Sequence, residues 1–215
     1  MSDVLFYEVL SMTLNELENK REIKLNFINP SNGKEREVTL LIDSSLKVSD
    51  LIDLAHPYVK MNAENGKLCI LEVLNNRISR VLLEDEEISA LNSYSSLYVD
   101  EIPNCLVESK SIFCFSYYRS PSNSHGIPFI LQVPKATTFE QLKPKIQAKL
   151  MLSDKEFLKC KFSLVYYTKA EPIEDSTILY DLDASSFHQL GIDHLDKSGN
   201  SMNASRYEKA IKIRS

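Results

Sequence analysis

Alternating hydrophobic and polar positions mark the first regular part of the chain, from Arg21 onward. The runs REIKLNFI and EREVTLLID both alternate with a period of two, which is typical of strands with one buried face. The intervening NPSNGK contains Pro, Asn and Gly, so the two runs predict a β-hairpin. The apolar positions are Ile23, Leu25, Phe27, Val38, Leu40 and Ile42.

A helical spacing follows in KVSDLIDLAH, where the apolar residues recur at i, i+3, i+4 and i+7. His56-Pro57 is expected to end or bend this helix. KLCILEVL and RISRVLL then predict two strands joined through Asn75-Asn76, and SSLYVDEI predicts a closing strand. The apolar face of the helix consists of Val48, Leu51, Ile52 and Ala55.

The same order begins again after a short linker. SIFCFSYYR and IPFILQV predict a second hairpin, whose connection SPSNSHG is rich in turn-forming residues. CKFSLVYYTK predicts a strand that starts at Cys160, and ILYDLD and LGIDHLDK complete the repeat. The pattern therefore indicates an internal duplication.

Between these segments, TTFEQLKPKIQAKL predicts the second helix. Thr138 and Gln141 have the spacing of a capping box. Pro144 falls inside the helix, where it removes a hydrogen bond, so we expect the helix either to restart at Pro144 or to be kinked there. The apolar face consists of Phe139, Leu142, Ile146 and Leu150.

The pattern as a whole predicts an α+β protein with two domains of one architecture. We place a connector at 1–20, the domains at 21–103 and 111–197, and a flexible spacer followed by a tail at 198–215. In the tail, Ile211 and Ile213 alternate with Lys212, as on an extended segment that can insert alternate side chains into pockets.

Composition and charge narrow the function classes. The 215 residues carry 25 basic and 30 acidic side chains, a formal net charge of -5, which argues against a nucleic-acid partner. There is no apolar run long enough to span a membrane, and the start lacks the basic flank of a signal peptide. A cytoplasmic or nuclear location, or both, is expected. The acidic run at 84–88 is interpreted as a solvated loop.

The cysteines and histidines do not have the spacing of a reactive or metal-binding site. The four cysteines are far apart in the sequence, and we interpret them as packing residues. His188 and His194 are interpreted as surface or packing residues, and the Cys and His spacings do not match those of a structural zinc site. We therefore expect no metal, no cofactor and no catalytic residue on this chain.

A resemblance to known proteins adds to this interpretation. TTFEQLKPKIQAKL resembles the central helix of ubiquitin. LFYEVLSMTLNELEN near the start, with LGIDHLDK and RYEKAIKIRS near the end, resembles the last two ubiquitin-like domains and tail of the herpesvirus-associated ubiquitin-specific protease and its fungal relatives. The resemblance covers nearly the whole chain and implies two tandem ubiquitin-like β-grasp domains.

The resemblance also implies a function. In this family the domains are non-catalytic, and the terminal peptide folds back onto a separate catalytic domain and stabilises its active arrangement. The family's nucleophile segment and its His-box have no counterpart in this sequence. The residues that align with the activating peptide are Tyr207, Glu208, Lys209, Ala210, Ile211, Lys212 and Ile213.

Two functional hypotheses follow. In the first, the chain is the regulatory region of a thiol-dependent deubiquitinase, and its partner is the catalytic domain of the same protein. In the second, it is a ubiquitin-like interaction module that recruits protein substrates or adaptors without affecting catalysis. Direct enzyme activity would need a nucleophile with an oriented base, and the sequence offers no such pair.

Overall fold

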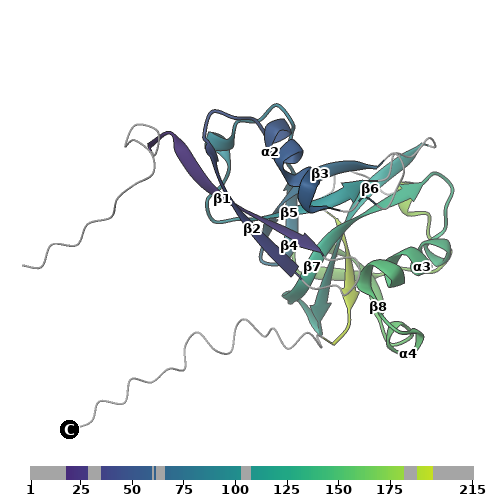
Figure 1. Cartoon of the computed structure of the whole chain (residues 1–215). Helices are drawn as coiled ribbons and strands as arrows, with labels where there is room; N and C mark the ends of the chain where they lie inside the picture. Colours follow the sequence, from purple (N-terminus) through teal and green to yellow (C-terminus); the bar gives the residue numbers. More distant parts are fainter. Residues whose placement is uncertain are drawn as a thin grey trace, which may run out of the picture. The chain divides into compact units, whose positions relative to one another are not determined.

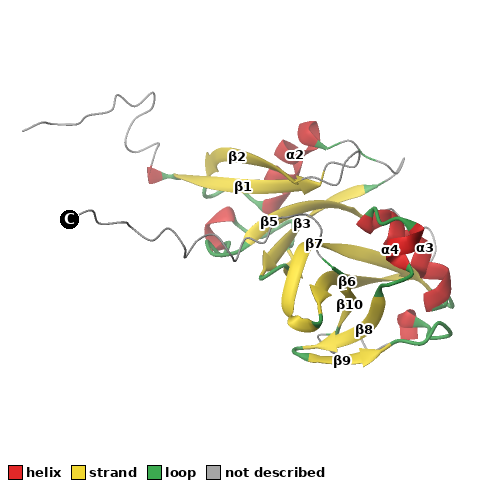
Figure 2. Ribbon diagram, turned by 90° about the horizontal axis from the view of Figure 1, so that it is seen from below, coloured by secondary structure: helices red, strands yellow, loops and turns green. Residues whose placement is uncertain are grey.

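The computed structural model describes residues 18–28, 35–59, 61, 66–102, 108–181 and 188–195. Contacts divide the chain into two compact units, one formed by 1–72 and 80–102 and the other by 73–79 and 103–215. Each unit is built on a five-stranded sheet (Figures 1 and 2).

The first sheet has the strand order β2-β1-β5-β3-β4. β1 pairs antiparallel with β2 in the predicted hairpin and parallel with β5, so the first and last strands lie together at the centre. Leu25 of β1 is paired with Leu97 of β5, and both belong to the core. The strands are β1 (Lys20–Ile28), β2 (Glu35–Asp43), β3 (Lys67–Leu74), β4 (Arg77–Val81) and β5 (Ser96–Ile102).

Helix α2 (Val48–Ala55) supplies the helical part of this core. The predicted apolar face is confirmed, because all four of its residues are buried. The 3-10 turn η1 (His56–Tyr58) follows directly and has Pro57 in its first turn, so the helix ends where the sequence predicted. A second 3-10 turn, η2 (Ile88–Ala90), precedes β5 and buries Ile88.

The acidic run before η2 is more than a solvated loop. Arg80 Nη1 lies 2.7 Å from Glu86 Oε1, and Arg80 Nε lies 2.7 Å from Glu72 Oε2. Lys67 also forms an ion pair with Glu84. Because Glu72 is 5% exposed, Arg80 neutralises a carboxylate that β3 carries into the interior.

The second sheet repeats the topology with the order β7-β6-β10-β8-β9. Its first and last strands, β6 and β10, again pair in parallel at the centre, with Cys114 opposite Leu190 in the core. The strands are β6 (Ser109–Tyr118), β7 (Ser120–Pro134), β8 (Lys161–Tyr166), β9 (Lys169–Pro172) and β10 (Gln189–Asp193). The predicted α+β class with two ubiquitin-like β-grasp folds is confirmed.

Helix α3 (Phe139–Leu150) packs on the second core through Phe139, Leu142 and Ile146, as predicted. Its N-cap is Thr138, whose backbone N–H donates to Gln141 Oε1 at 3.0 Å. The helix runs through Pro144 without restarting. The short helix α4 (Asp154–Phe157) and the 3-10 turn η3 (Leu179–Asp181) were not assigned from the sequence.

The prediction that SPSNSHG forms a long connection is wrong. β7 begins at Ser120, and the turn is reduced to Arg119 at a φ of 64°. Two register shifts in the β6–β7 ladder allow the polar run to stay paired with β6. Turn-forming residues are therefore used here in an irregular strand. The strand predicted from Cys160 starts one residue later, at Lys161, and β9 was missed.

The hairpin tip at 73–79 groups by its contacts with the second unit. Asn75 and Asn76 both have positive φ, at 51° and 58°, as a tight hairpin turn requires. Next to them, the Arg77 guanidinium lies 4.1 Å from the centre of the Phe115 ring and donates to Pro121 O at 2.6 Å. Burial lowers the pKa of Arg77. Phe115 belongs to a small apolar cluster on the outer face of the second sheet, together with Tyr117 and Val165.

Candidate functional site

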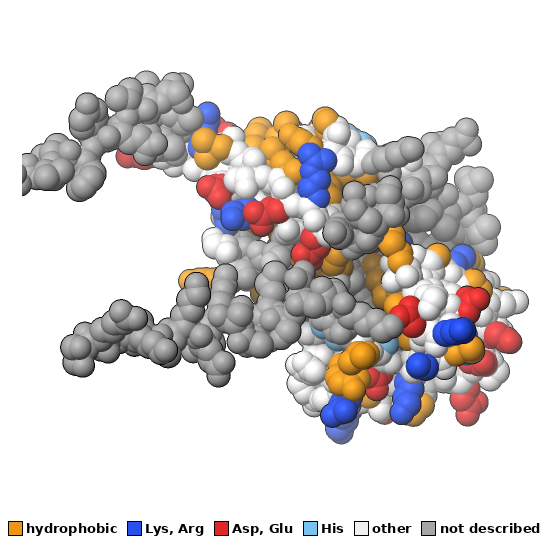
Figure 3. Space-filling model, turned by 60° about the horizontal axis from the view of Figure 1, so that its bottom comes forward, with side chains coloured by type: hydrophobic (Ala, Val, Ile, Leu, Met, Phe, Trp, Pro, Cys, Tyr) orange, Lys and Arg blue, Asp and Glu red, His pale blue; other side chains and the backbone are white. Residues whose placement is uncertain are grey.

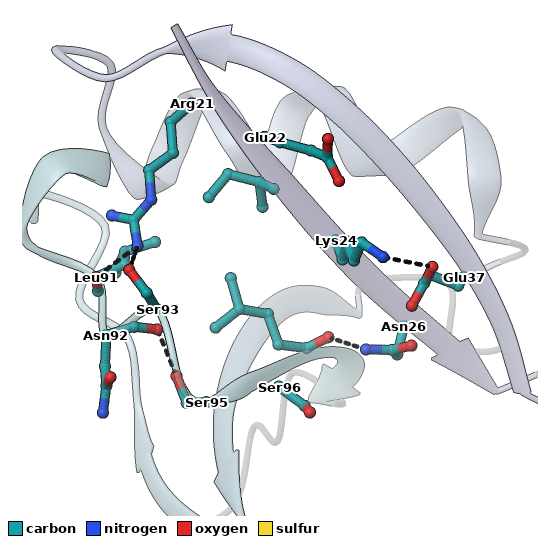
Figure 4. A pocket seen from close by; sticks show the side chains of 12 residues that line it. Arg21, Glu22, Lys24, Asn26, Glu37, Leu91, Asn92, Ser93, Ser95 and Ser96 are labelled. Carbon is teal, nitrogen blue, oxygen red and sulfur yellow. Dashed lines mark hydrogen bonds and ion pairs between the residues drawn. The ribbon is translucent and has the colours of Figure 1, made fainter. Parts of the chain in front are cut away.

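A polar cavity of about 190 Å³ lies on the first unit, between β1 and the segment that leads into β5. Figure 4 shows Glu22, Lys24 and Asn26 projecting from β1, with Asn92, Ser93 and Ser95 on the opposite wall. Lys24 Nζ is 3.5 Å from Glu37 Oε1, and Asn26 Nδ2 donates to Leu97 O at 3.1 Å.

Arg21 closes one end of this cavity. Its guanidinium donates to Ile88 O at 2.7 Å, to Leu91 O at 2.8 Å and to Ser93 Oγ at 2.8 Å. These acceptors belong to the loop that precedes β5, so Arg21 holds this loop against β1.

The residues that line the cavity do not form a catalytic arrangement. They include no cysteine and no histidine. Among its serines, Ser95 donates through Oγ to the buried Glu72 at 2.8 Å and also contacts Asn92 O. The carboxylate that accepts this bond is also held by Arg80, so Ser95 and Glu72 belong to the ion-pair network that stabilises the first unit.

The second feature is the point at which the chain leaves the second sheet. β10 pairs with β6 on one side and with β8 on the other. Immediately after it, His194 N donates to Tyr117 O at 3.0 Å, which extends the pairing by one residue. Asp193 Oδ1 accepts from Arg119 N at 2.9 Å. The described part of the chain ends two residues after β10, at Leu195.

Two imidazoles secure this exit point. His194 Nε2 lies 2.9 Å from Ser116 Oγ, and His125 Nε2 lies 2.9 Å from His194 O. The two rings meet edge to face with their centres 4.9 Å apart. We call Ser116, His125, Asp193 and His194 the exit cluster. His194 was predicted to be a surface or packing residue, and these contacts are those of a packing residue.

Ser116 and His194 are as close as a nucleophile and its base, but the serine is buried inside the sheet. Ser116 is only 3% exposed and lies within β6, paired with both neighbouring strands. The other ring nitrogen, His194 Nδ1, lies 3.3 Å from Leu195 O, in the segment that follows β10. This geometry holds the end of β10 against β6.

The described cysteines also lack the surroundings of a reactive thiol. Cys69 and Cys114 are buried, and none of the three described cysteines forms a disulfide. Burial, with the nearby carboxylates of Asp193 and Glu156, raises the pKa of Cys160 to about 11. A thiol with a raised pKa is a poor nucleophile near neutral pH. Within the described ranges, His, Cys, Asp and Glu form no group of three that could hold a metal ion.

The predicted activating residues Tyr207, Glu208, Lys209, Ala210, Ile211, Lys212 and Ile213 lie outside the described residues. The exit cluster was not anticipated from the sequence. The relevant signal was His125 within SPSNSHG, which was interpreted as a loop and so could not be placed opposite Ser116.

The face in Figure 3 offers both apolar and charged side chains. On the face in Figure 3, basic and acidic side chains are mixed, and apolar side chains reach the surface. No helix in the described ranges is long and apolar enough to cross a membrane.

Comparison with known proteins identifies the chain's relatives. The family model described as "Ubiquitin-specific protease C-terminal" matches residues 4–199. Ubiquitin carboxyl-terminal hydrolase 15 of Schizosaccharomyces pombe is 30% identical over 212 residues, which cover 92% of this chain and 18% of that protein. Ubiquitin C-terminal hydrolase 12 of Arabidopsis thaliana is 28% identical, with 99% and 21% covered.

An animal protein is also similar to this chain. Ubiquitin carboxyl-terminal hydrolase 7 of Drosophila melanogaster is 26% identical over 232 residues, which cover 97% of this chain and 20% of that protein. The chain thus spans about a fifth of the length of these relatives. With the family model matched over most of its length, the chain belongs to the ubiquitin-specific protease C-terminal family.

Proposed function

We propose that this chain is the non-catalytic regulatory region of a ubiquitin-specific thiol protease, and that its C-terminal tail activates a separate catalytic domain. The names of its relatives support a parent deubiquitinase. The Ser–His contact and the cysteines of the described residues have the surroundings of structural groups, which supports a non-catalytic role.

The observation that carries this proposal is the anchoring of β10. This strand is hydrogen-bonded on both sides, and the exit cluster fixes the residue that follows it. A peptide attached to such a point starts from a defined position. Tethering raises the effective concentration of a weak ligand at a nearby site, without any increase in its intrinsic affinity.

The tail has suitable chemistry for such a ligand. Ile211 and Ile213 are separated by one residue, so an extended peptide presents both on one side. Burying one isoleucine side chain contributes about 1.5–3 kcal/mol. Two such anchors are enough to shift a modest equilibrium between inactive and active forms of the catalytic domain.

The test is a reconstitution with two proteins. The isolated catalytic domain is mixed with this chain, and hydrolysis of a ubiquitin-linked fluorogenic reporter is followed. We expect activation by the full chain and its loss when residues 204–215 are removed. Hydrolysis by the chain alone would instead support direct enzyme activity.

Point variants test whether activation depends on the two isoleucines or only on the presence of a tail. Ile211→Asp and Ile213→Asp should each abolish activation, because a charged side chain cannot enter an apolar pocket without a large desolvation cost. Ser215→Asp adds the same charge beyond the isoleucines and should preserve activation. Equal activation by all three variants would contradict a role for the isoleucines.

The alternative is an interaction module that recruits substrates or adaptors through the domain surfaces. It is favoured by the apolar side chains left exposed on both units, such as Leu83 at 64% and Tyr167 at 68%. In the same reconstitution, binding of a protein partner with no change in turnover would support this function.

The finer assignments belong to the same proposal. We place the parent protein among the herpesvirus-associated proteases in a fungal-type form, supported by the 30% identity to the fission yeast hydrolase. The domain limits 21–103 and 111–197, a cytoplasmic or nuclear location, and an intramolecular catalytic partner are proposed with it.

A further inference from the structure

We propose that the turn of the β8–β9 hairpin is part of a docking surface for an extended segment of a partner protein that combines prolines with a carboxylate. The surface consists of the rings of Tyr166, Tyr167 and His188 and the guanidinium of Arg77, and we call it the aromatic surface. All four residues belong to the same compact unit. β9 is an edge strand of the second sheet, and Figure 2 shows its hairpin with β8.

The first argument is that three exposed rings are in contact with one another. Tyr166 is 39% exposed, Tyr167 is 68% exposed, and His188 is exposed as well. The centre of the Tyr166 ring lies 4.6 Å from that of Tyr167 and 5.2 Å from that of His188. Rings that already pack on one another lose little conformational freedom when a partner covers them. They therefore offer a ready contact area.

The backbone at Tyr167 provides the second argument. Tyr166 pairs with Lys169, which leaves Tyr167 and Thr168 as the turn of the hairpin. Tyr167 has a φ of 52°, in the left-handed region where asparagine and glycine are favoured. The β3–β4 turn has asparagines at its positive-φ positions. A tyrosine here is neither the residue that the turn favours nor a buried one, so its ring has a use at the surface.

The third argument is the kind of hydrogen bond that the surface offers. Neither the Tyr166 nor the Tyr167 hydroxyl has a hydrogen-bond partner within the described ranges, so each can donate to a carbonyl of a partner. A proline-rich segment suits such donors, because its prolines lack a backbone N–H and its carbonyls make no internal hydrogen bonds. Extended proline-rich segments also dock in aromatic-lined grooves.

Arg77 supplies the charge complementarity. Its guanidinium donates to Tyr167 O at 2.9 Å, which places it beside the turn. It also donates to Pro121 O and stacks on Phe115, and it forms no ion pair with a carboxylate of the described residues. Of the five N–H groups of a guanidinium, two donate to these carbonyls, which leaves three for a partner. A partner carboxylate would neutralise this cation.

These features fit a protein segment better than a nucleic acid or a membrane. Bases could stack on the rings, but a phosphate backbone needs several cations, and on β9 the charges of Lys169 and Glu171 are opposite. Insertion into a lipid surface needs a continuous apolar face, whereas these three rings all carry polar atoms. A short segment with prolines and one carboxylate matches the rings, the hydroxyls and the guanidinium together.

The experiment titrates the full chain with a fluorescein-labelled peptide of prolines around a single glutamate, followed by fluorescence anisotropy. We expect saturable binding, with amide shifts in a parallel NMR titration clustered at 166–169 and 188–189. Removal of residues 204–215 should leave the affinity unchanged, so this test is separate from that of activation by the tail. Absence of saturable binding, or shifts centred elsewhere, would overturn the proposal.

Variants of the chain test the tyrosine at the turn. Tyr167→Asn removes the ring and supplies a residue that the turn favours, so binding should weaken about tenfold without loss of the fold. Tyr167→Phe keeps the ring and should weaken binding about threefold, because only the hydroxyl is lost. Tyr94→Asn, at an exposed tyrosine of the first unit, is the matched control and should bind normally. Normal binding by Tyr167→Asn would contradict the proposal.

Variants of the peptide test the class of partner. Glutamine in place of glutamate should weaken binding and remove its salt dependence, since the ion pair with Arg77 is lost. Leucine in place of proline should also weaken binding, and equal affinity would exclude a preference for proline. A single-stranded oligothymidine and vesicles with anionic lipid should bind less tightly than the peptide. Tighter binding of either one, lost in Tyr167→Asn, would overturn the assignment to a protein partner.

Discussion

The two sheets share one strand order but use their outer faces differently. In the first sheet, Asn26 of β1 lies opposite Tyr98 of β5, and the Tyr98 hydroxyl donates to Glu35 at 2.8 Å. At the equivalent register of the second sheet, Phe115 lies opposite Gly191. A polar outer face in one unit corresponds to a small apolar cluster in the other.

This difference shows which positions the topology determines. The inward residues of the paired strands are apolar in both units, with Leu97 and Val99 of β5 matched by Leu190 and Ile192 of β10. Strand order and core therefore follow from the shared alternation. The outer faces are free to diverge, and in the second unit that freedom depends on Gly191.

The largest expected effect is that of Gly191→Tyr, which copies the first unit into the second. A Cβ at Gly191 would lie 2.5 Å from Val165 Cγ2 and 2.8 Å from Tyr117 Cε1, so even the first added atom clashes. We expect the free energy of unfolding of the second unit to fall by about 3 kcal/mol or more. Amide hydrogen exchange, followed separately for the two sheets, measures this loss. Exchange should become faster in the second sheet and stay slow in the first.

Gly126→Ala is the control for this substitution. Gly126 has a φ of 66° but nothing within 4 Å of an added Cβ, so only conformational strain is introduced. We expect this strain to lower the free energy of unfolding by about 1 kcal/mol. If the two variants were equally destabilised, steric crowding around Gly191 would not be the cause.

The second prediction concerns the ion pair that the first unit buries. Arg80→Met leaves the Glu72 carboxylate, whose side chain is 7% exposed, without its cation and still bound by the Ser95 hydroxyl. We expect the free energy of unfolding in urea to fall by about 2 kcal/mol. Adding Glu72→Gln should restore part of the loss. In the second unit, Lys135 and Glu108 form an exposed pair, so Lys135→Met should cause no measurable change.

The parts of the fold that could be predicted were those governed by periodicity. The face of α2, the capping box of α3 and the Asn75-Asn76 turn depend on residues within a few positions of one another. Such local patterns are visible in a sequence. They were sufficient for the order of the elements along the chain, whereas the β-grasp arrangement of the strands was implied by the resemblance to ubiquitin-like domains.

The exit cluster and the irregular β7 could not be predicted in this way. Ser116 and His194 are 78 positions apart, and their meeting depends on parallel pairing of β6 with β10. The register shifts in β7 place His125 opposite Ser116, against the local preference of SPSNSHG for a turn. Tertiary pairing overrode propensity at this site.

The next prediction uses pH to separate the two outer faces. Burial and the contact with Glu35 raise the pKa of Tyr98 above its usual range. The neutral phenol therefore stabilises the folded state below the unfolded pKa of about 10, and this contribution is lost as pH rises above it. At pH 11 the first unit should be weakened by about 1 kcal/mol, measured by urea unfolding.

Tyr98→Phe should remove this alkaline dependence. Tyr94→Phe is the matched control, because Tyr94 is 93% exposed. An unchanged alkaline slope in Tyr98→Phe would mean that another group is responsible.

The smallest expected effect distinguishes the two helices. The N-cap residues Lys47 and Thr138 have similar extended backbones, with φ and ψ of -97° and 165° in one and -75° and 158° in the other. Threonine can accept a hydrogen bond from the first turn, whereas a lysine side chain has no acceptor. Lys47→Ser should stabilise the first unit by about 0.5 kcal/mol, and Thr138→Ala should destabilise the second by about 1 kcal/mol. Both N-cap residues already have the backbone conformation that a cap requires. Opposite shifts in the urea midpoints of the two units would therefore show that the helices differ at this position through the side chain alone.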